Sequence, residues 1–302
     1  MTPPVSRIRA AARLGFVLAA LAACHPVQEP TAPAQRPRLG AGFRWSVYGP
    51  KYNPGPEYWA RVGREMAARF PGATPEAIWI VSRVRGEGTQ FNFPVSAAEP
   101  GIEGTAEDGN EEALALFDEL GFRVWLQVEP SFVPVEPLID LVLARYRQHR
   151  CVVGFGIDVE WYRSFTPDEG QAVTDAEAAA WLAAVRRHDP SYRLFLKHFE
   201  AEKMPPTMRD GLLFIDDSQI YPSLDAMVDE FTEWARTFAP APVAFQYGYL
   251  SDRPWWVKLD DPPAEIGRRI LEVAPNTAGL FWVDFSVLEV FPPDRRPTAE
   301  AP

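Results

Sequence analysis

Eight apolar, strand-like runs alternate with segments of helical period along most of this 302-residue chain, and this alternation most constrains its fold. The strand-like runs are 43–48, 78–84, 123–129, 152–161, 193–199, 212–219, 243–249 and 279–285. The helical segments are 57–70, 110–120, 137–149, 174–188, 224–238 and 263–273, and the proline-interrupted connection 201–210 is the weakest helix. Strands that alternate with helices form βαβ units and a parallel sheet. Eight of them in one domain predict an α/β fold, a single-domain (β/α)8 TIM barrel. No GxGxxG follows the first strand, so a dinucleotide-binding fold has no local support.

The N-terminus has the features of a bacterial secretion signal. Arg7, Arg9 and Arg13 precede the apolar run 14–21, which is too short to span a bilayer. The run ends in Leu-Ala-Ala-Cys, which resembles a bacterial lipobox with cleavage before Cys24 and a lipid on its sulfur. We therefore expect a signal peptide over residues 1–23 and attachment to a membrane through Cys24. His25 stands where an inner-membrane retention Asp would lie, which favours the outer membrane of the cell envelope.

The composition outside the barrel predicts flexible ends. Residues 24–41 combine the lipidated Cys24 with a Pro-rich tether, 42–291 form the barrel, and 292–302 are a disordered tail. The net charge is −11 and becomes −14 once residues 1–24, which hold three arginines and no acid, are not counted. So acidic a chain is not expected to bind nucleic acid. Only Cys151 remains besides Cys24, so no internal disulfide can form.

Barrel geometry predicts where the chemistry lies, because side chains alternate along a strand and active sites form at the C-terminal ends of the strands. In the fourth run, Asp158 and Glu160 share the inward-facing phase with Gly154 and Gly156. Two carboxylates side by side above a barrel core are costly unless a site uses them. They are the first candidates for catalysis.

Neighbouring runs send further polar and aromatic groups to the same mouth. The sixth run is equally apolar in both phases, so its inward side chains are left open. Acids, amides and aromatic rings around one mouth suit a sugar, because they transfer protons, hydrogen-bond hydroxyls and stack on pyranose rings. The candidates that face this mouth are Trp125, Gln127, Glu129, Lys197, Asp217, Tyr221, Gln246, Trp282 and Asp284, with Arg83 from the second strand.

Two loops add to the mouth. The long connection 85–110 has the length of a lid or substrate wall. The pair Trp255 and Trp256 follows the seventh strand, and either lines the cleft or anchors its loop.

The stretch Gly-Ile-Asp-Val-Glu-Trp-Tyr at 156–162 resembles the fourth-strand signature of family 18 glycoside hydrolases, the chitinase type. The resemblance implies a barrel glycosidase in which Glu160 is the proton donor and Asp158 its helper. It further implies that Trp282 forms the floor of the sugar subsite and that Tyr221 holds the reacting acetamido group. Gly154 and Gly156 stand where the family carries further acids.

The sequence therefore predicts an envelope-tethered glycoside hydrolase that acts on a poly- or oligosaccharide without a cofactor; a monomer is favoured, and the sequence leaves the oligomeric state open. Glu160 is the general acid, Asp158 stays ionised, and Glu129, Asp217 or Asp284 supplies a second carboxylate. His149, His188 and His198 lack the spacing of metal ligands, so no metal site is expected.

Three alternatives stay open. Asp158 and Glu160 can be a structural ion pair with Lys197 or Arg83. The barrel can be a non-catalytic carbohydrate-binding lipoprotein. A lyase or isomerase can use Lys197 as base or Schiff-base amine.

Overall fold

The structure is a computed structural model that describes residues 37–293, apart from 97–99 and 168. The predicted signal peptide, the lipid site at Cys24, and most of the predicted tether and tail lie outside the described residues. Within the described part of the chain, no helix is long and apolar enough to cross a membrane.

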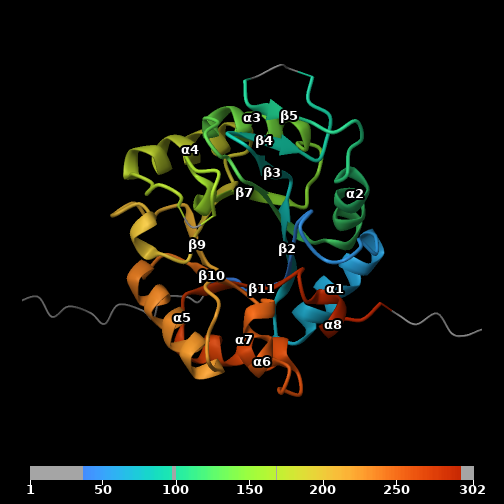
Figure 1. Cartoon of the computed structure of the whole chain (residues 1–302), viewed down its shortest axis with the longest axis vertical. Helices are drawn as coiled ribbons and strands as arrows, with labels where there is room; N and C mark the ends of the chain where they lie inside the picture. The colour runs from blue at the N-terminus through green and yellow to red at the C-terminus, as the bar shows by residue number, and fades with distance from the viewer. Residues whose placement is uncertain (1–36, 97–99, 168, 294–302) are drawn as a thin grey trace, which may run out of the picture. The chain divides into compact units, whose positions relative to one another are not determined.

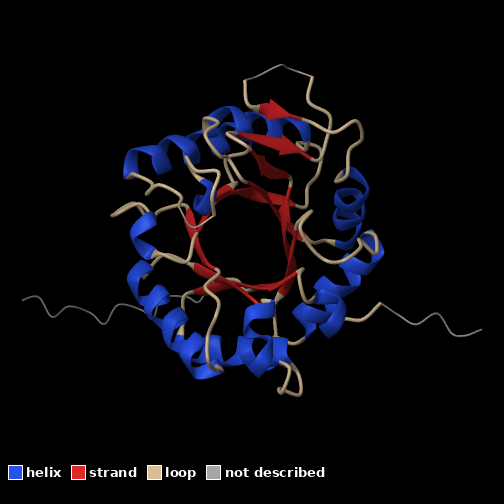
Figure 2. Ribbon diagram, viewed as in Figure 1, coloured by secondary structure: helices blue, strands red, loops and turns tan. Residues whose placement is uncertain are grey.

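Eight parallel strands close into a barrel in the order β1-β11-β10-β9-β8-β7-β6-β2, and the helices surround it (Figures 1 and 2). The (β/α)8 fold predicted from the alternation is confirmed. The barrel strands are β1 (Gly40–Trp45), β2 (Thr74–Ile80), β6 (Arg123–Val128), β7 (Val152–Asp158), β8 (Arg193–Lys197), β9 (Leu212–Asp216), β10 (Val243–Tyr247) and β11 (Thr277–Val283). Strand β1 begins at Gly40, so its first two residues belong to the barrel and not to the predicted tether.

The helices match the predicted periodic segments closely. The longer ones are α1 (Pro56–Ala68), α2 (Glu111–Leu120), α3 (Val135–Arg145), α4 (Asp175–His188), α5 (Leu224–Phe238) and α7 (Pro262–Val273). Short turns complete the set: α6 (Arg253–Trp256), α8 (Val287–Val290) and the 3-10 helices η1 (Val159–Trp161), η2 (Ala201–Lys203) and η3 (Leu250–Asp252). The predicted weak connection after the fifth strand thus holds a 3-10 turn in place of an α-helix.

The barrel interior is a separate apolar cluster from the layer between strands and helices. Its buried members are Ile78, Ile80, Trp125, Phe195, Leu213, Ile215, Ala244, Ala278 and Phe281. Leu213 and Ile215 face inward while Leu212 and Phe214 join the outer layer, which settles the phase of β9.

Two glycines of β7 make room for aromatic rings in this interior. A Cβ atom on Gly156 would lie 2.0 Å from the ring of Phe195, and one on Gly154 would lie 2.6 Å from the indole of Trp125. The strand therefore has no room for the additional acids that family 18 carries there.

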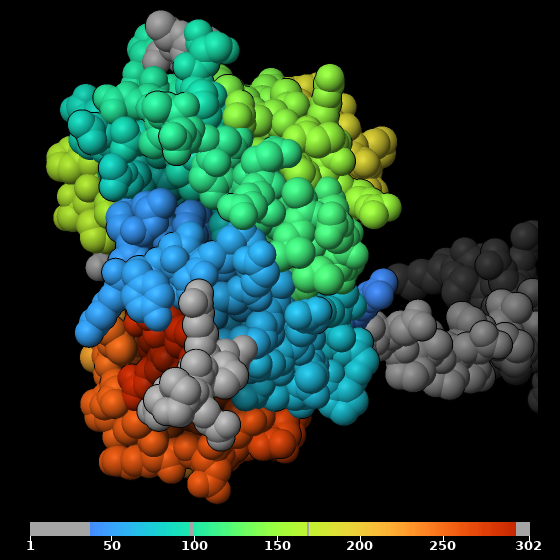
Figure 3. All heavy atoms as spheres, turned by 90° about the vertical axis from the view of Figure 1, so that its right-hand side faces the viewer, coloured from blue at the N-terminus to red at the C-terminus, as the bar shows by residue number. Residues whose placement is uncertain are grey.

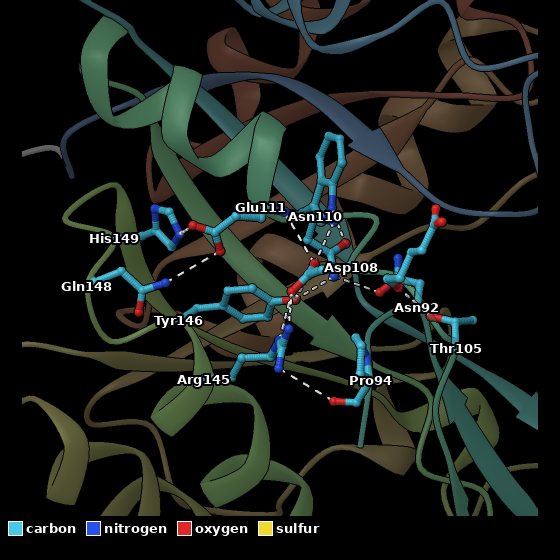
Figure 4. A network of polar contacts seen from close by, with 12 residues as sticks. Asn92, Pro94, Thr105, Asp108, Asn110, Glu111, Arg145, Tyr146, Gln148 and His149 are labelled. Carbon is cyan, nitrogen blue, oxygen red and sulfur yellow. Dashed lines mark hydrogen bonds and ion pairs between the residues drawn. The ribbon is translucent and has the colours of Figure 1, made fainter. Parts of the chain in front are cut away.

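The long connection after β2 is a substructure with its own small sheet. It forms a three-stranded sheet of β3 (Ser82–Arg85), β4 (Gly88–Phe91) and β5 (Ile102–Glu103). Figure 4 shows the polar network that fixes its end to α2 and α3. Asp108 accepts hydrogen bonds from Arg145 and Tyr146, while Asn110 donates to the Tyr146 hydroxyl oxygen at 2.7 Å.

Candidate active site

The ammonium group of Lys197 lies at the centre of a carboxylate cluster at the mouth of the barrel. Its Nζ is 3.1 Å from Asp158 Oδ2, 2.8 Å from Glu160 Oε1 and 2.7 Å from Asp217 Oδ2. The three acids come from the ends of β7 and β9, and Lys197 is the last residue of β8, which lies between them. Three carboxylates around one cation leave a net negative charge.

Asp158 is held by the strands on both sides of it. Besides its contact with Lys197, it accepts a hydrogen bond from Gln127 Nε2 of β6 at 3.1 Å. The predicted inward phase of Gln127, Asp158 and Lys197 is therefore confirmed. The ion pair with Lys197 that we weighed as a structural alternative is present as well.

Glu160 reaches the cluster by a different route from the predicted one. Strand β7 ends at Asp158, and Glu160 lies in the 3-10 turn η1 that follows. The simple alternation that pointed Glu160 inward does not extend this far. The turn nevertheless brings its carboxyl group to Lys197, and its side chain remains 12% exposed.

Of the three acids, Asp158 and Glu160 have raised pKa values, chiefly through burial, whereas the pKa of Asp217 is lowered. Burial, and next the charge of Asp217, raise the pKa of Glu160 well above its usual range. Burial also acts to raise the pKa of Asp217, but Lys197, Tyr249 and a hydrogen bond with Glu160 hold it below its usual range. Asp217 Oδ1 is buried and accepts no hydrogen bond from an amide, hydroxyl or ammonium group of the described residues. A proton held by Glu160 and donated to Asp217 satisfies both groups.

Lys197 is locked in its charged form. Burial alone lowers the pKa of an ammonium group, but Asp158, Asp217 and Glu160 together raise that of Lys197 well above its usual range. An amine must lose its proton to act as a base or to form a Schiff base. This environment therefore disfavours the lyase alternative that uses Lys197.

A pocket of about 420 Å³ opens beside two of the acids. Glu160 and Asp217 form part of its wall, whereas Asp158 does not. The other lining residues are Phe199, Ser218, Gln219, Ile220, Tyr221 and Glu230. The predicted site residue Tyr221 thus lies in the same pocket as Glu160, and Phe199 adds a second aromatic ring.

Two further predicted acids, Glu129 and Asp284, do not contact Lys197 and have other partners. Glu129 accepts a hydrogen bond from the Tyr48 hydroxyl at 2.6 Å and one from the Val84 amide at 3.0 Å. Burial, and next the charge of Asp158, raise the pKa of Glu129 to about 7. Asp284 pairs with Arg44 at 3.1 Å, so its charge is already compensated.

The prediction that Trp282 faces the barrel mouth is wrong. Phe281 belongs to the interior cluster, so Trp282 points to the helical layer, where it is fully buried. Its Nε1 donates to Ser286 Oγ at 2.9 Å, and the indole packs edge-on against Trp256. Gly248 provides the space, because a Cβ there would lie 2.4 Å from the indole.

Neither Trp125 nor Arg83 contacts the carboxylate cluster. Trp125 faces inward as predicted, but it fills the opposite end of the barrel, where Nε1 donates to Glu76 Oε1 at 2.5 Å. Arg83 is exposed on β3 and donates to Gln90 of β4, so it contacts neither Asp158 nor Glu160. Neither residue reaches the pocket.

Gln246 and the tryptophan pair after β10 form hydrogen bonds within the protein. Gln246 is buried in the inward phase as predicted and accepts a long hydrogen bond, 3.4 Å, from the Tyr249 hydroxyl. Trp255 and Trp256 donate to the backbone carbonyl oxygens of Tyr221 and Tyr249. Of the two roles considered for this pair, the structure shows loop anchoring.

Several residues of the site were not found from the sequence. Tyr249 follows β10 and donates to Asp217 Oδ2 at 3.0 Å, but nothing in its local pattern separates it from other loop tyrosines. Five exposed aromatic side chains of the described residues also follow the C-terminal ends of barrel strands: Tyr48, Tyr52, Phe132, Phe165 and Phe285. Their position after the strand ends is the only sequence signal that points to them.

Among the described residues, no group of three or more His, Cys, Asp or Glu side chains is arranged to hold a metal ion.

No family model and no curated protein matches the chain. Among solved structures, a β-glucuronidase from an uncultured Clostridium species is similar to it at 11% identity and a TM-score of 0.43. That match covers 82% of this chain and 43% of the glucuronidase, so the chain spans less than half of that protein's length. A GH5-4 broad specificity endoglucanase from an uncultured bacterium is similar at 10% identity and a TM-score of 0.42, over 81% of this chain and 87% of that one.

Proposed function

We propose that the protein is a glycoside hydrolase tethered to the bacterial cell envelope, with Glu160 as its general acid. One observation carries the proposal: Glu160 and Asp217 contact the same ammonium group, have opposite pKa shifts and line the same pocket. Two carboxyl groups driven to opposite protonation states supply the acid and the anion that glycosidic cleavage needs.

Glu160 donates its proton to the glycosidic oxygen as the bond to the anomeric carbon breaks. Its raised pKa keeps it protonated where an ordinary carboxyl group is ionised, and its side chain is accessible from the pocket. Asp158 positions Lys197 and, through it, Glu160. This role corresponds to the helper predicted from the fourth-strand pattern.

Asp217 is the partner that stays ionised. Its oxygen and that of Glu160 contact one nitrogen at 2.7 and 2.8 Å, so they cannot be farther apart than the sum of these distances. An inverting pair needs a wider gap, about 6.5–9.5 Å, to admit the attacking water. Retaining pairs stand about 5–5.5 Å apart, so Glu160 and Asp217, which share a hydrogen bond, have to separate only slightly when a sugar enters between them. On this ground we assign Asp217 as the nucleophile of a retaining mechanism. It bonds to the anomeric carbon as the leaving group departs, and Glu160 then takes a proton from the water that releases the sugar.

The surroundings of the mouth suit a carbohydrate. Phe199 and Tyr221 offer aromatic faces inside the pocket, and Phe132 and Phe165 are exposed with ring centroids 6.1 Å apart. Aromatic rings stack on the apolar faces of pyranose rings, while the acids and amides bind hydroxyl groups. A poly- or oligosaccharide is the substrate class that uses both.

Attachment to the envelope rests on the sequence alone. The basic start, the short apolar run and Leu-Ala-Ala-Cys support a lipid on Cys24, and His25 supports the outer membrane. Mass spectrometry of the protein from membrane fractions tests this part, with Cys24→Ser as the variant that releases the chain.

The hydrolase is tested with purified protein and a panel of aryl glycosides and polysaccharides. Wild type should release reducing ends, and Glu160→Gln should lower kcat/KM by about 10²–10⁴ on unactivated substrates while binding persists. Asp217→Asn should abolish turnover, and the first sugar product should keep its anomeric configuration by NMR. Glu233→Gln, an exposed acid on α5, is the matched control and should behave as wild type.

A second candidate function is carbohydrate binding without catalysis. It is favoured by the contact of Lys197 with all three acids, because this contact stabilises the acids in the absence of a substrate. Saturable glycan binding by wild type, with no product from any member of the panel, would establish that function in place of hydrolysis.

A further inference from the structure

A pocket rich in arginine lies at the end of the barrel opposite the carboxylate cluster. It has a volume of about 640 Å³, and five arginines are part of its lining: Arg38, Arg123, Arg147, Arg150 and Arg193. Arg123 and Arg193 are the first residues of β6 and β8, whereas the acids follow the ends of β7 and β9. We call these five residues and the space between them the arginine pocket.

The arginine pocket is positively charged, whereas the whole chain has a net negative charge. Among the described residues that line it, Asp189 is the only acid, and its carboxylate accepts hydrogen bonds from the amide and hydroxyl of Ser191. Arg147 and Arg150 are exposed, and no carboxylate of the described residues pairs with either. A concentrated positive patch on a chain of net charge −11 favours the binding of an anionic ligand.

The inner wall of the arginine pocket is held in place by the barrel. Arg123 pairs with the buried Glu76 at 2.8 Å, and Arg193 lies over the indole of Trp125 at 5.7 Å. Burial lowers the pKa of Arg193, and repulsion from Arg123 adds to this effect, which Glu76 offsets only in part. An anion in the pocket would relieve the repulsion between the two guanidinium groups. Guanidinium groups also match phosphate oxygens in geometry.

The described chain begins at this same end. Pro37 and Arg38 line the arginine pocket and lead directly into β1 at Gly40. In Figure 3 the blue start of the described chain lies at the right-hand edge, whereas the blue segment that follows β1 lies at the left. Only the 12 residues from His25 to Arg36 separate the predicted lipid site from this end, a span of about 40 Å even when fully extended.

We propose that the arginine pocket binds the phosphate headgroups of anionic lipids in the membrane that carries the lipid anchor. This inference rests on the anchoring of Cys24 that belongs to the proposed function. The lipid tether and the arginines then contact the same surface, and the barrel mouth with Glu160 and Asp217 faces away from it. Such an orientation presents the active site to glycans outside the lipid headgroup layer.

The test uses the mature chain, residues 24–302, with Cys24→Ser, so that vesicle binding does not depend on a lipid anchor. Vesicles of phosphatidylcholine are compared with vesicles that contain an increasing fraction of phosphatidylglycerol, by co-sedimentation at low and high salt. Arg147→Gln with Arg150→Gln removes two exposed arginines of the pocket. The matched control, Arg85→Gln with Arg253→Gln, removes two exposed arginines that follow the opposite ends of barrel strands.

Binding should increase with phosphatidylglycerol and decrease with salt. The pocket variant should lose about 30-fold in partition coefficient, roughly 5-fold for each arginine, while the control stays near wild type. A highly acidic chain without such a patch is repelled by anionic vesicles, so absence of binding overturns the proposal. An equal loss in the control overturns it too.

Two further measurements separate the possible causes of failure. In the first, inorganic phosphate is added at millimolar concentration and the NMR signals of the arginines are followed. If these signals shift while the protein does not bind vesicles, the pocket binds a free phosphate compound and the lipid assignment is overturned. Glycan hydrolysis by the pocket variant should equal that of wild type. Loss of vesicle binding therefore leaves the hydrolase proposal intact, and loss of hydrolysis in wild type leaves the vesicle result intact.

Discussion

The Nζ of Lys197 lies 2.7 Å from Asp217 Oδ2, and both side chains are almost completely buried at the mouth of the barrel. This pair connects β8 with the loop that follows β9, and the same ammonium group also contacts Asp158 and Glu160. Lys197 therefore stabilises the fold and sets the protonation of the acids at the same time.

Lys197→Met should destabilise the protein by about 3–5 kcal/mol, because it leaves buried carboxylates without their cation. Urea unfolding measures the loss, and Lys258→Met, at an exposed lysine, should change the free energy of unfolding by less than about 0.5 kcal/mol. The loss should shrink as the pH falls, since protonation of the acids removes their repulsion. A variant as stable as wild type at neutral pH would contradict this role of Lys197.

Glu129 should make the protein less stable as the pH rises. Its pKa of about 7 in the folded protein lies above the ordinary value of 4.5, so the folded state binds this proton more tightly than the unfolded state. As the pH rises from 4.5 to about 7, ionisation of Glu129 alone should lower the free energy of unfolding by roughly 3 kcal/mol. Glu129→Gln should flatten that slope and be the more stable protein at pH 8, as measured by urea unfolding across the pH range.

Tyr48→Phe provides the control for Glu129. The Tyr48 hydroxyl donates to Glu129 Oε2 and so favours the ionised carboxylate. Its removal should shift the titration of Glu129 to higher pH, whereas Glu129→Gln should remove that titration. Identical pH profiles for wild type and both variants would show that Glu129 does not titrate in this range.

Trp282→Phe should lower stability without changing glycan binding. The indole is buried in the helical layer, and the change removes its hydrogen bond to Ser286 and part of its packing, at a cost of about 1–3 kcal/mol. Phe199→Ala should do the opposite, raising KM for glycans with a small effect on stability, because Phe199 lines the pocket. Thermal unfolding and steady-state kinetics separate the two. A raised KM in Trp282→Phe alone would return Trp282 to the substrate site.

Most of the fold could be predicted from the sequence because a parallel barrel repeats one simple pattern. Each strand is an apolar run of limited length, and each helix shows its own period, as α5 does with the same bounds as its predicted segment. The second connection was harder to predict. Its three short strands pair only with one another, and the polar contacts of Asp108 and Asn110 that fix its end join residues distant in sequence.

The site could be predicted only where a strand kept its alternation. Gln127, Asp158 and Lys197 lie in regular strands and face inward as expected. Strand β11 reads Leu-Phe-Trp-Val, in which either phase buries an aromatic ring. Trp282 fits in the helical layer because Gly248, in the loop after β10, leaves room for its indole, and this contact is not visible in the local sequence pattern. Asp217 was one of three candidates for the second carboxylate, and the sequence could not choose among them because the choice depends on the contacts of Asp217 with Lys197 and Tyr249.

The most direct test of the central claim is a leaving-group series of aryl glycosides with wild type and Glu160→Gln. If Glu160 protonates the leaving group, kcat/KM of the variant should fall steeply as the phenol becomes a weaker acid. Wild type should depend on it only weakly, and the two should converge for the most acidic phenols, which leave without protonation. Parallel dependence in the two proteins, or a variant as active as wild type on unactivated glycosides, would contradict the assignment of Glu160 as the general acid.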